Sequence, residues 1–380
     1  MVALYEPRDV PGALADRHPG EFAYIRQFAR WPARELVRNV DTHVLALSAG
    51  DTLMPVTLDR PRAGNCYVVS PTAAYTDYAR YELQIVPSGA ARLAGEALIS
   101  AVSLWLRRVR LDRIVHVNNW MLSTNLYGEW SGEGLAEIVE ALSALYPDRA
   151  IVLRSLNTFS NATLLDRAAR CGCQLLPSRQ IYIQDGRQAG GRRLAGRRDY
   201  KQDGRLFAQT GYRVCAPDPD REPCVFDRIE SLYAKLYLER YTPLNPQFTS
   251  HWLRNGCADG WLKLFCLISP EGGIDGVAGM IERGDTITTP VLGYDTDLPQ
   301  SLGLYRMLCR ICTDEAIARG LALNGSAGAA SFKRSRGGVP HVEYSAVFAD
   351  HLGFESRLAW RTLSALLNRF AAPLLQRYAL

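Results

Sequence analysis

Apolar residues recur at two different spacings along the first half of the chain. Short apolar runs at residues 43–47, 66–69, 114–117 and 150–153 are typical of strands. The apolar spacing of residues 90–107, 134–145 and 161–171 is helical. Strands and helices therefore alternate, which predicts a mixed fold in which helices cover a sheet.

The second half continues this mixture. Residues 226–241 have one aromatic and aliphatic face, which predicts a helix, and residues 261–269, 276–282 and 286–292 predict consecutive antiparallel strands joined by Gly-rich turns. A helix, a strand, a short helix, a strand and a helix follow in that order. The fold class that this predicts is α+β, or mixed α/β, with sheets that are mostly antiparallel and flanked by helices.

One composition shift divides the chain. Residues 186–205 are rich in Gly and Arg and poor in large apolar side chains, which is typical of a crossing between domains. A chain of 380 residues is long enough for two cores. We expect a first domain at residues 1–185, a basic crossing at 186–205 and a second domain at 206–380. In both halves a charged helix precedes a strand, at residues 165–183 and 314–323, which raises the question of a distant duplication.

Charge and cysteine content exclude several classes of protein. The net charge of +5 is small and by itself says little about nucleic acid. The N-terminal residues lack the apolar core of a signal peptide, and no later stretch has the ~18 uninterrupted apolar residues of a membrane span, so we expect a cytoplasmic protein. Nine scattered cysteines do not form a disulfide framework. Cys309 and Cys312 lack a second ligand pair, and we expect no metal.

A polar turn at residues 294–305 opens a predicted helix. Free backbone N–H groups and the positive end of the helix dipole make such a start suitable for a phosphate or a carboxylate. The plainer alternative is helix capping, with Asp297 or Ser301 as the cap. Gln300 and Gly303 lie in this turn, three residues apart.

A second polar segment follows at residues 321–340. It contains a Gly- and Ser-rich strand exit around Ser326, then the pair Phe332 and Lys333, then Arg336 in a basic, Gly-terminated turn. A strand at residues 341–348 comes next. This layout is suited to handling an anion or a thioester.

These two segments carry a resemblance to a known group. Gln300 and Gly303 resemble the Gln/Arg-x-x-Gly-x-Gly/Ala signature with which GNAT-superfamily N-acyltransferases hold the pyrophosphate of coenzyme A. Tyr305 stands where that signature has a small residue and would crowd a pyrophosphate. The Phe332–Lys333 pair and the following strand look like those of FemAB-type acyltransferases.

The resemblance spans residues 192–350 and implies two GNAT-like (acyl-CoA N-acyltransferase) domains. The first half would be the acceptor side and the second the acyl-donor side. As co-substrate it implies acyl-CoA, with a carrier protein or aminoacyl-tRNA as alternatives. The donor-binding residues that it implies are Gln300, Ser301, Gly303, Ser326, Phe332 and Arg336.

N-acyl transfer needs a neutral amine, stabilisation of the carbonyl oxygen and a proton for the leaving group. Lys333 is the candidate for the oxyanion, since the resembled lysine lies at the donor end of the site. Tyr305 and Tyr344 are candidates to protonate the leaving group, and Asp295 and Glu343 are candidate bases. The alternative for each is a solvated or packing side chain.

A loop rich in amides, aromatic residues and hydroxyl groups follows the strand at residues 114–117. Such a loop is suited to line a cleft and bind a polar acceptor, or else packs on the surface. Arg154 and Glu82 are further candidates for acceptor binding. The candidates within the loop are Asn118, Asn119, Trp120, Asn125 and Tyr127.

Together these features predict an N-acyltransferase that acts on an amine of a small-molecule or amino-acid-like acceptor. A close alternative is amide formation from aminoacyl-tRNA, because residues 186–205 are basic and Tyr305 disrupts the pyrophosphate signature. A third alternative is a non-catalytic GNAT-like binding protein, because the sequence shows no unambiguous base. The acceptor, the acyl chain and the oligomeric state stay open.

Overall fold

The computed structural model describes residues 2–83, 89–373 and 375. Its strands form a single sheet whose spatial order is β1-β2-β3-β4-β5-β12-β6-β11-β10-β9-β8-β7. The strands are β1 (Val2–Tyr5), β2 (Thr42–Ala49), β3 (Thr52–Asp59), β4 (Ile114–Val117), β5 (Ala150–Asn157), β6 (Gln174–Asp185), β7 (Arg213–Cys215), β8 (Lys263–Ile268), β9 (Ile274–Arg283), β10 (Thr286–Tyr294), β11 (Ala322–Asn324) and β12 (Val339–Phe348).

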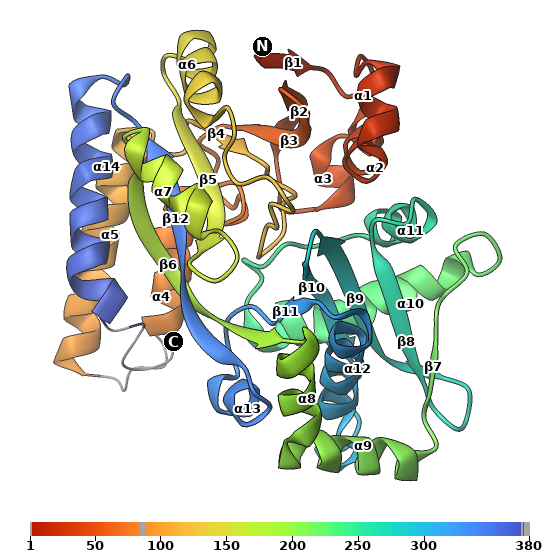
Figure 1. Ribbon diagram of the computed structural model, residues 1–380. Coiled ribbons are helices and arrows are strands. Elements are labelled where there is room, and N and C mark those ends of the chain that lie inside the picture. The colour runs from red at the N-terminus through yellow and green to blue at the C-terminus, as the bar shows by residue number, and fades with distance from the viewer. Residues whose placement is uncertain (1, 84–88, 374, 376–380) are drawn as a thin grey trace.

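Helices lie against this sheet along its whole length (Figure 1). The α-helices are α1 (Gly12–Arg17), α2 (Pro19–Arg26), α3 (Ala33–Leu36), α4 (Tyr78–Leu83), α5 (Ala90–Arg108), α6 (Leu135–Leu145), α7 (Ala162–Arg170), α8 (Gln188–Gly196), α9 (Arg198–Thr210), α10 (Pro223–Tyr233), α11 (Ser250–Ala258), α12 (Leu304–Arg319), α13 (Ala330–Ser335) and α14 (Phe354–Leu366). Short 3₁₀ or π segments are η1 (Gln27–Ala29), η2 (Ala73–Asp77), η3 (Ala234–Tyr241), η4 (Gln300–Leu302) and η5 (Leu367–Ala371).

The mixed, mostly antiparallel sheet with flanking helices is as the sequence predicted. The two halves also repeat one strand pattern. In the first half β1 to β4 form an antiparallel meander, and α6 then leads to β5, which is parallel to β4. In the second half β7 to β10 form the same meander, and α12 leads to β11, which is parallel to β10.

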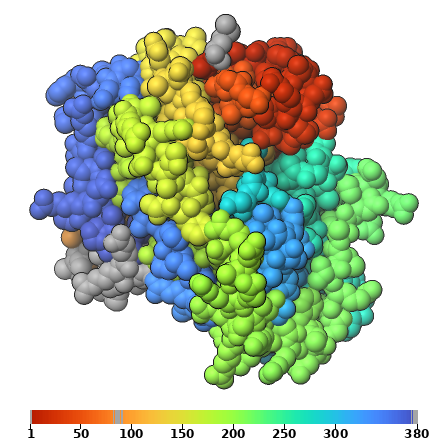
Figure 2. Space-filling view, viewed as in Figure 1, coloured from red at the N-terminus to blue at the C-terminus, as the bar shows by residue number. Residues whose placement is uncertain are grey.

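The last strand of the chain crosses from one half to the other. β12 lies between β5 and β6 and is antiparallel to both. β6 pairs with β12 along residues 174–183 and, at its far end, with β11. Residues 339–348, which the sequence places in the second domain, thus complete the sheet of the first half. Figure 2 shows blue C-terminal atoms packed against the yellow-green surface of residues near 175.

One local prediction differs from the structure. Residues 66–69 lie in a turn rather than a strand, and Val68 and Val69 are instead buried in the core. The predicted crossing at residues 186–205 contains α8 and the first part of α9. The glycines in this segment permit close packing, because a Cβ on Gly186 would lie 2.4 Å from the carbonyl oxygen of Leu321.

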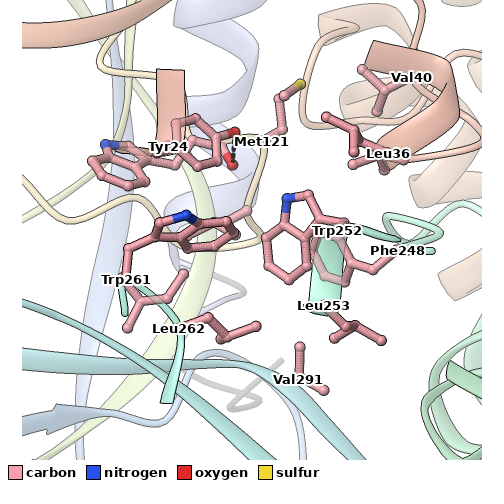
Figure 3. Close-up of a cluster of buried hydrophobic side chains, with 14 of the residues drawn as sticks. Tyr24, Leu36, Val40, Met121, Phe248, Trp252, Leu253, Trp261, Leu262 and Val291 are labelled. Carbon is pink, nitrogen blue, oxygen red and sulfur yellow. Dashed lines mark hydrogen bonds between the residues drawn. The ribbon is translucent and has the colours of Figure 1, made fainter. Parts of the chain in front are cut away.

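A core shared by both halves joins them. Trp120 and Met121 of the first half pack with Trp252 and Trp261 of the second, all of them buried. The Tyr24 hydroxyl donates a hydrogen bond to the Trp120 carbonyl at 2.6 Å. Figure 3 shows Tyr24 and Met121 of the first half beside the rings of Trp252 and Trp261 of the second.

Within the described residues no helix combines the length and the apolar run of a membrane span.

Because this core contains side chains from both halves, we expect the halves to unfold together. Trp252 is fully buried and stacks on Phe248 at 4.1 Å, so Trp252→Ala should lower the free energy of unfolding by about 3–5 kcal/mol. Hydrogen exchange in urea should show β3 and β9 losing protection at the same lowered urea concentration. Phe354→Ala, which truncates an exposed side chain, is the control. Loss of protection in β9 alone would contradict this expectation.

Candidate functional site

The parallel strands β10 and β11 separate soon after they begin. They pair only from Thr286 to Thr288, opposite Ala322 to Asn324. A bulge follows in β10 between Thr288 and Val291, and Pro290 lies inside it. Because proline has no N–H to donate, it favours a bulge and the end of a ladder. Beyond the bulge β10 keeps its pairing with β9 but has no strand partner on its β11 side among the described residues.

Lys333 holds the loop that leaves β11. Its ammonium group donates hydrogen bonds to the carbonyl oxygens of Gly325 at 2.6 Å, Ser326 at 3.3 Å and Ala327 at 2.7 Å. Ser326 and Ala329 have positive φ angles of 59° and 48°, which non-glycine residues seldom adopt. Burial lowers the pKa of Lys333 to about 8, while the three carbonyl oxygens favour its charged form. Lys333 therefore positions this loop, with its donors directed at the backbone.

Tyr305 lies in the first turn of α12 and is one of the two tyrosines that the sequence predicted as proton donors. Its ring lies 4.8 Å from that of Phe332 and 6.3 Å from that of Tyr294. Burial raises the pKa of Tyr305, and it raises the pKa of the neighbouring Cys309 to about 11. Both groups therefore stay protonated at neutral pH, so Tyr305 has a proton to donate, although a raised pKa makes a phenol a weaker acid.

The π-helix η3 brings two more tyrosines to the same region. Tyr237 packs against the same cluster as Tyr305 and Cys309, and its ring lies 6.0 Å from that of Tyr241. Burial raises the pKa of Tyr237 as well. π-Helical turns occur frequently at functional sites, where they redirect side chains. Tyr237 and Tyr305 thus pack against one apolar cluster that includes Ile287 and Leu292 of β10, and both phenols stay protonated.

A buried ion pair forms the border of this region on β6 and β12. The Arg179 guanidinium binds both oxygens of Glu343, at 2.8 and 3.3 Å, and Glu343 is 3 % exposed. Burial alone would lower the pKa of Arg179, but the Glu343 carboxylate raises it above its ordinary value. Arg179 also donates to the Thr124 hydroxyl at 2.7 Å. The pair joins the two shared strands to the loop of the first half.

The start of α12 is covered by α9. Asp203 on α9 accepts from Arg306 at 2.6 Å and from Arg336 at 2.6 and 3.0 Å. A Cβ on Gly303 would lie 2.4 Å from a methyl carbon of Leu206. The predicted phosphate seat is therefore in contact with a carboxylate and a leucine of the protein itself.

The structure brings some of the predicted catalytic residues together and separates others. Tyr305 contacts Phe332, which precedes Lys333 in α13. Glu343 is fully engaged with Arg179. Tyr344 points to the other face of β12, where it packs against the first-half core. Their catalytic roles stay proposals, but the geometry favours Tyr305 among them.

Asp295 is surrounded by cations. Lys235 binds it at 2.5 Å and Arg228 at 2.9 Å. Burial would raise the pKa of Asp295, but these two partners lower it to about 2. A carboxylate with so low a pKa is a poor proton acceptor at neutral pH, so the geometry gives Asp295 an anchoring role in place of the predicted basic one.

The predicted donor-binding residues are also divided. Gln300 and Ser301 are exposed in η4, and Gly303 is buried beneath Leu206. Ser326 belongs to the loop held by Lys333, and Phe332 contacts Tyr305. Arg336 is bound to Asp203.

The predicted acceptor loop is mostly internal, which corrects its expected role. Asn118 donates to the Leu126 carbonyl at 2.9 Å, and Asn119 donates to the Thr57 hydroxyl at 2.9 Å. The amide groups thus form hydrogen bonds within the protein and are not available to bind a ligand. The side chains of Asn118, Asn119, Trp120, Asn125 and Tyr127 are each 3 % exposed or less.

Arg154 is also turned inward, with its guanidinium on the carbonyl oxygens of Val68 at 3.2 Å and Leu122 at 3.4 Å. Burial lowers its pKa. The side chain of Glu82 lies outside the described part of the chain.

The halves do enclose a cleft, of about 920 Å³. Trp120, Tyr127 and Trp130 of the loop line one wall, and residues 280–284 line the other. This cleft lies at the beginning of β10, whereas Tyr305 follows its far end. A cleft between the halves therefore exists; that it binds the acceptor stays a prediction, and its lining residues do not include Tyr305.

Several residues of this region were not predicted. Tyr233, Tyr237 and Tyr241 recur every four residues in a predicted helix, which is a signal that the sequence contains. Asp203 gives no such signal, because an acidic residue in a polar segment is normally exposed. Among the described residues no three His, Cys, Asp or Glu side chains gather as metal ligands would.

Comparison with known proteins finds similarity in structure only. No protein-family profile and no curated protein matches the sequence. The C-terminal domain (DUF2156) of a putative lysylphosphatidylglycerol synthetase from Agrobacterium fabrum is similar over 67 % of this chain and 82 % of that chain, at 15 % identity and a TM-score of 0.44.

Two further structures have the same kind of likeness. FemX is similar over 57 % of this chain and 76 % of its own, at 10 % identity and a TM-score of 0.45. A tandem GNAT protein from the clavulanic acid biosynthesis pathway is similar over 91 % of this chain and 98 % of its own, at 8 % identity and a TM-score of 0.38. These neighbours are of the GNAT and FemX-like group that the sequence resembles. At such identities the likeness concerns the fold alone.

We expect Asp295→Asn to lower the stability of the fold and to leave the catalytic step unchanged. A carboxylate whose pKa falls from 3.8 to about 2 on folding stabilises the folded state above pH 3.8, and this stabilisation is lost as the pH falls towards 2. The variant should therefore be less stable than the parent by about 2 kcal/mol at pH 7. Urea unfolding at pH 7, 4 and 3 should show this difference shrinking with acid. A difference that does not change with pH would contradict the assignment.

Proposed function

We propose that the chain transfers an acyl group from a thioester to an amine of a small-molecule or amino-acid-like acceptor. The observation that carries this proposal is the unpaired side of β10 beyond Thr288. An extended ligand with amide groups, such as the pantetheine arm of coenzyme A or of a carrier protein, is suited to pair with such a strand edge. Its thioester would then lie beside the phenols of α12 and η3.

In this reaction the amine nitrogen attacks the thioester carbonyl carbon. A C–N bond forms, the C–S bond breaks, and the sulfur leaves as a thiolate that takes a proton. Tyr305 gives that proton from its hydroxyl group and regains one from the nitrogen through solvent. The products are an amide and a thiol.

Tyr305 and Lys333 have different parts in this proposal. The raised pKa of Tyr305 keeps its proton available at neutral pH. Lys333 acts as a positioning residue, because it fixes the loop of Gly325 to Ala327 beside the site. Phenol proton donors of this kind contribute about 10²- to 10⁴-fold in rate.

Tyr305→Phe should lower kcat by about 10²-fold with an alkyl thioester donor. The loss should be much smaller with an aryl thioester, because an aryl thiolate leaves without a proton. Single-turnover rates with the two donors measure this difference. Tyr344→Phe is the control, because Tyr344 packs on the opposite face of β12. Equal losses with both donors would exclude Tyr305 as the acid, and no transfer with any donor would favour the non-catalytic alternative.

A second candidate donor is aminoacyl-tRNA, whose ester would undergo the same attack and leave as a ribose hydroxyl. The supporting observation is a basic face on α8 and α9, next to the start of α12. Its exposed cations form no ion pair among the described residues: Arg192, Arg193, Arg197, Arg198, Lys201 and Arg205. Such a face is suited to the phosphates of RNA.

If this face binds tRNA, the affinity should fall steeply with salt. Replacing four of its cations should reduce the slope of log affinity against log salt by about 0.7–0.9 for each phosphate that the variant no longer neutralises. Filter binding of tRNA at several salt concentrations measures the slope. The variant replaces Arg192, Arg198, Lys201 and Arg205 with Ala, and its control replaces four exposed arginines elsewhere, Arg8, Arg34, Arg108 and Arg170. Equal slopes for both variants would contradict this use of the basic face.

A further inference from the structure

The start of α12 has the features of an anion site. Its first N–H groups point out of the helix, where the positive end of the helix dipole favours negative charge. The Arg306 side chain extends from the first turn, and Arg336 reaches the same place from the end of α13. Two guanidinium groups beside a helix start are well suited to a phosphate.

This place already holds a negative charge. Both oxygens of Asp203 face Arg336, at 2.6 and 3.0 Å, and one of them also accepts from Arg306 at 2.6 Å. The Asp203 side chain is 1 % exposed. A carboxylate that accepts three charge-assisted hydrogen bonds satisfies both arginines in the way that a bound phosphate would.

The helix that carries Asp203, α9, contacts α12 and its preceding turn at several points along its length. Near one end of α9 the Tyr200 hydroxyl donates to Asp314 of α12 at 2.6 Å, and Arg310 lies over the Tyr200 ring at 3.7 Å. One turn beyond Asp203, Leu206 packs against Gly303. These contacts lie on both sides of Asp203, so the carboxylate is held at the helix start by the packing of two helices.

We infer that Asp203 is a specificity determinant that occupies the place of an anion between the guanidinium groups of Arg306 and Arg336, beside the start of α12, and excludes a phosphate group of the donor from it. The inference concerns the donor side of the proposed function. The donor is then recognised through its amide-bearing arm on β10, and any phosphate that it carries lies elsewhere. Gln300 and Gly303 suggest that the pyrophosphate of coenzyme A binds at this place, and Asp203 excludes it.

Removing the carboxylate should create a phosphate site. In Asp203→Ala the guanidinium groups of Arg306 and Arg336 lose the carboxylate that they share, Arg336 keeps only its longer ion pair with Asp199 at 3.6 Å, and inorganic pyrophosphate is able to replace Asp203. Calorimetric titration should show pyrophosphate binding at least about tenfold more tightly to Asp203→Ala than to the parent chain. The variant should also gain thermal stability from pyrophosphate.

Asp314→Ala is the matched control, because it removes a carboxylate from Arg310 further along the same helix. It should bind pyrophosphate no better than the parent chain. Asp203→Asn keeps the size of the side chain and serves if the alanine variant does not fold, and it should bind more tightly than the parent chain. Equal affinity in the parent chain and both Asp203 variants would overturn the inference, as would tight binding to the parent chain that Arg306→Met abolishes.

Acyl-pantetheine and acyl-CoA provide a second measurement. The parent chain should bind them with affinities within about threefold of each other, whereas Asp203→Ala should favour acyl-CoA about tenfold. The pyrophosphate titration needs no transfer activity. An inactive chain in which Asp203→Ala gains pyrophosphate affinity would therefore count against the proposed function and still support the inference.

Discussion

The pairing of β6 with β12 is the constraint on which the rest of the structure depends. β12 comes from the far end of the chain and lies between β5 and β6, so the sheet of the first half is complete only when the second half has been traversed. β6 is long enough to pair with β12 along most of its length and with β11 at its end. Because the shared strands leave neither sheet with a free edge at the joint, the two halves form one continuous sheet.

This exchange of strands also determines where buried charges meet. Arg179 and Glu343 lie opposite each other on β6 and β12, and their ion pair fixes the register of the two strands at the border of the candidate site. Asp203 with Arg306 and Arg336 fixes α9 and α13 at the start of α12 in the same way. Buried ion pairs contribute little net stability, but removing one partner is costly, so they are effective at holding elements in one arrangement.

The cleft and the candidate proton donors lie in different parts of the molecule. The 920 Å³ cleft lies between the halves at the beginning of β10, whereas the phenols, Lys333 and the unpaired side of β10 gather towards its other end. Burial explains the character of the second region. It keeps Tyr305 and Cys309 protonated and leaves the Lys333 ammonium dependent on three carbonyl oxygens. The region is therefore rich in proton donors and has no free carboxylate among its described members.

The sequence by itself determined the elements and much of their order. Apolar spacing predicted most of the strands and helices, and the Gly-rich turns marked where strands of the second half end, because these features act through the local backbone. Only the tertiary structure decided that β12 belongs to the sheet of the first half, that Asn118 to Tyr127 are internal, and that Asp203 covers the predicted phosphate seat. These facts depend on contacts between residues more than 100 positions apart or on burial of polar side chains. Local patterns contain no information about either, since a buried amide or carboxylate looks the same in sequence as an exposed one.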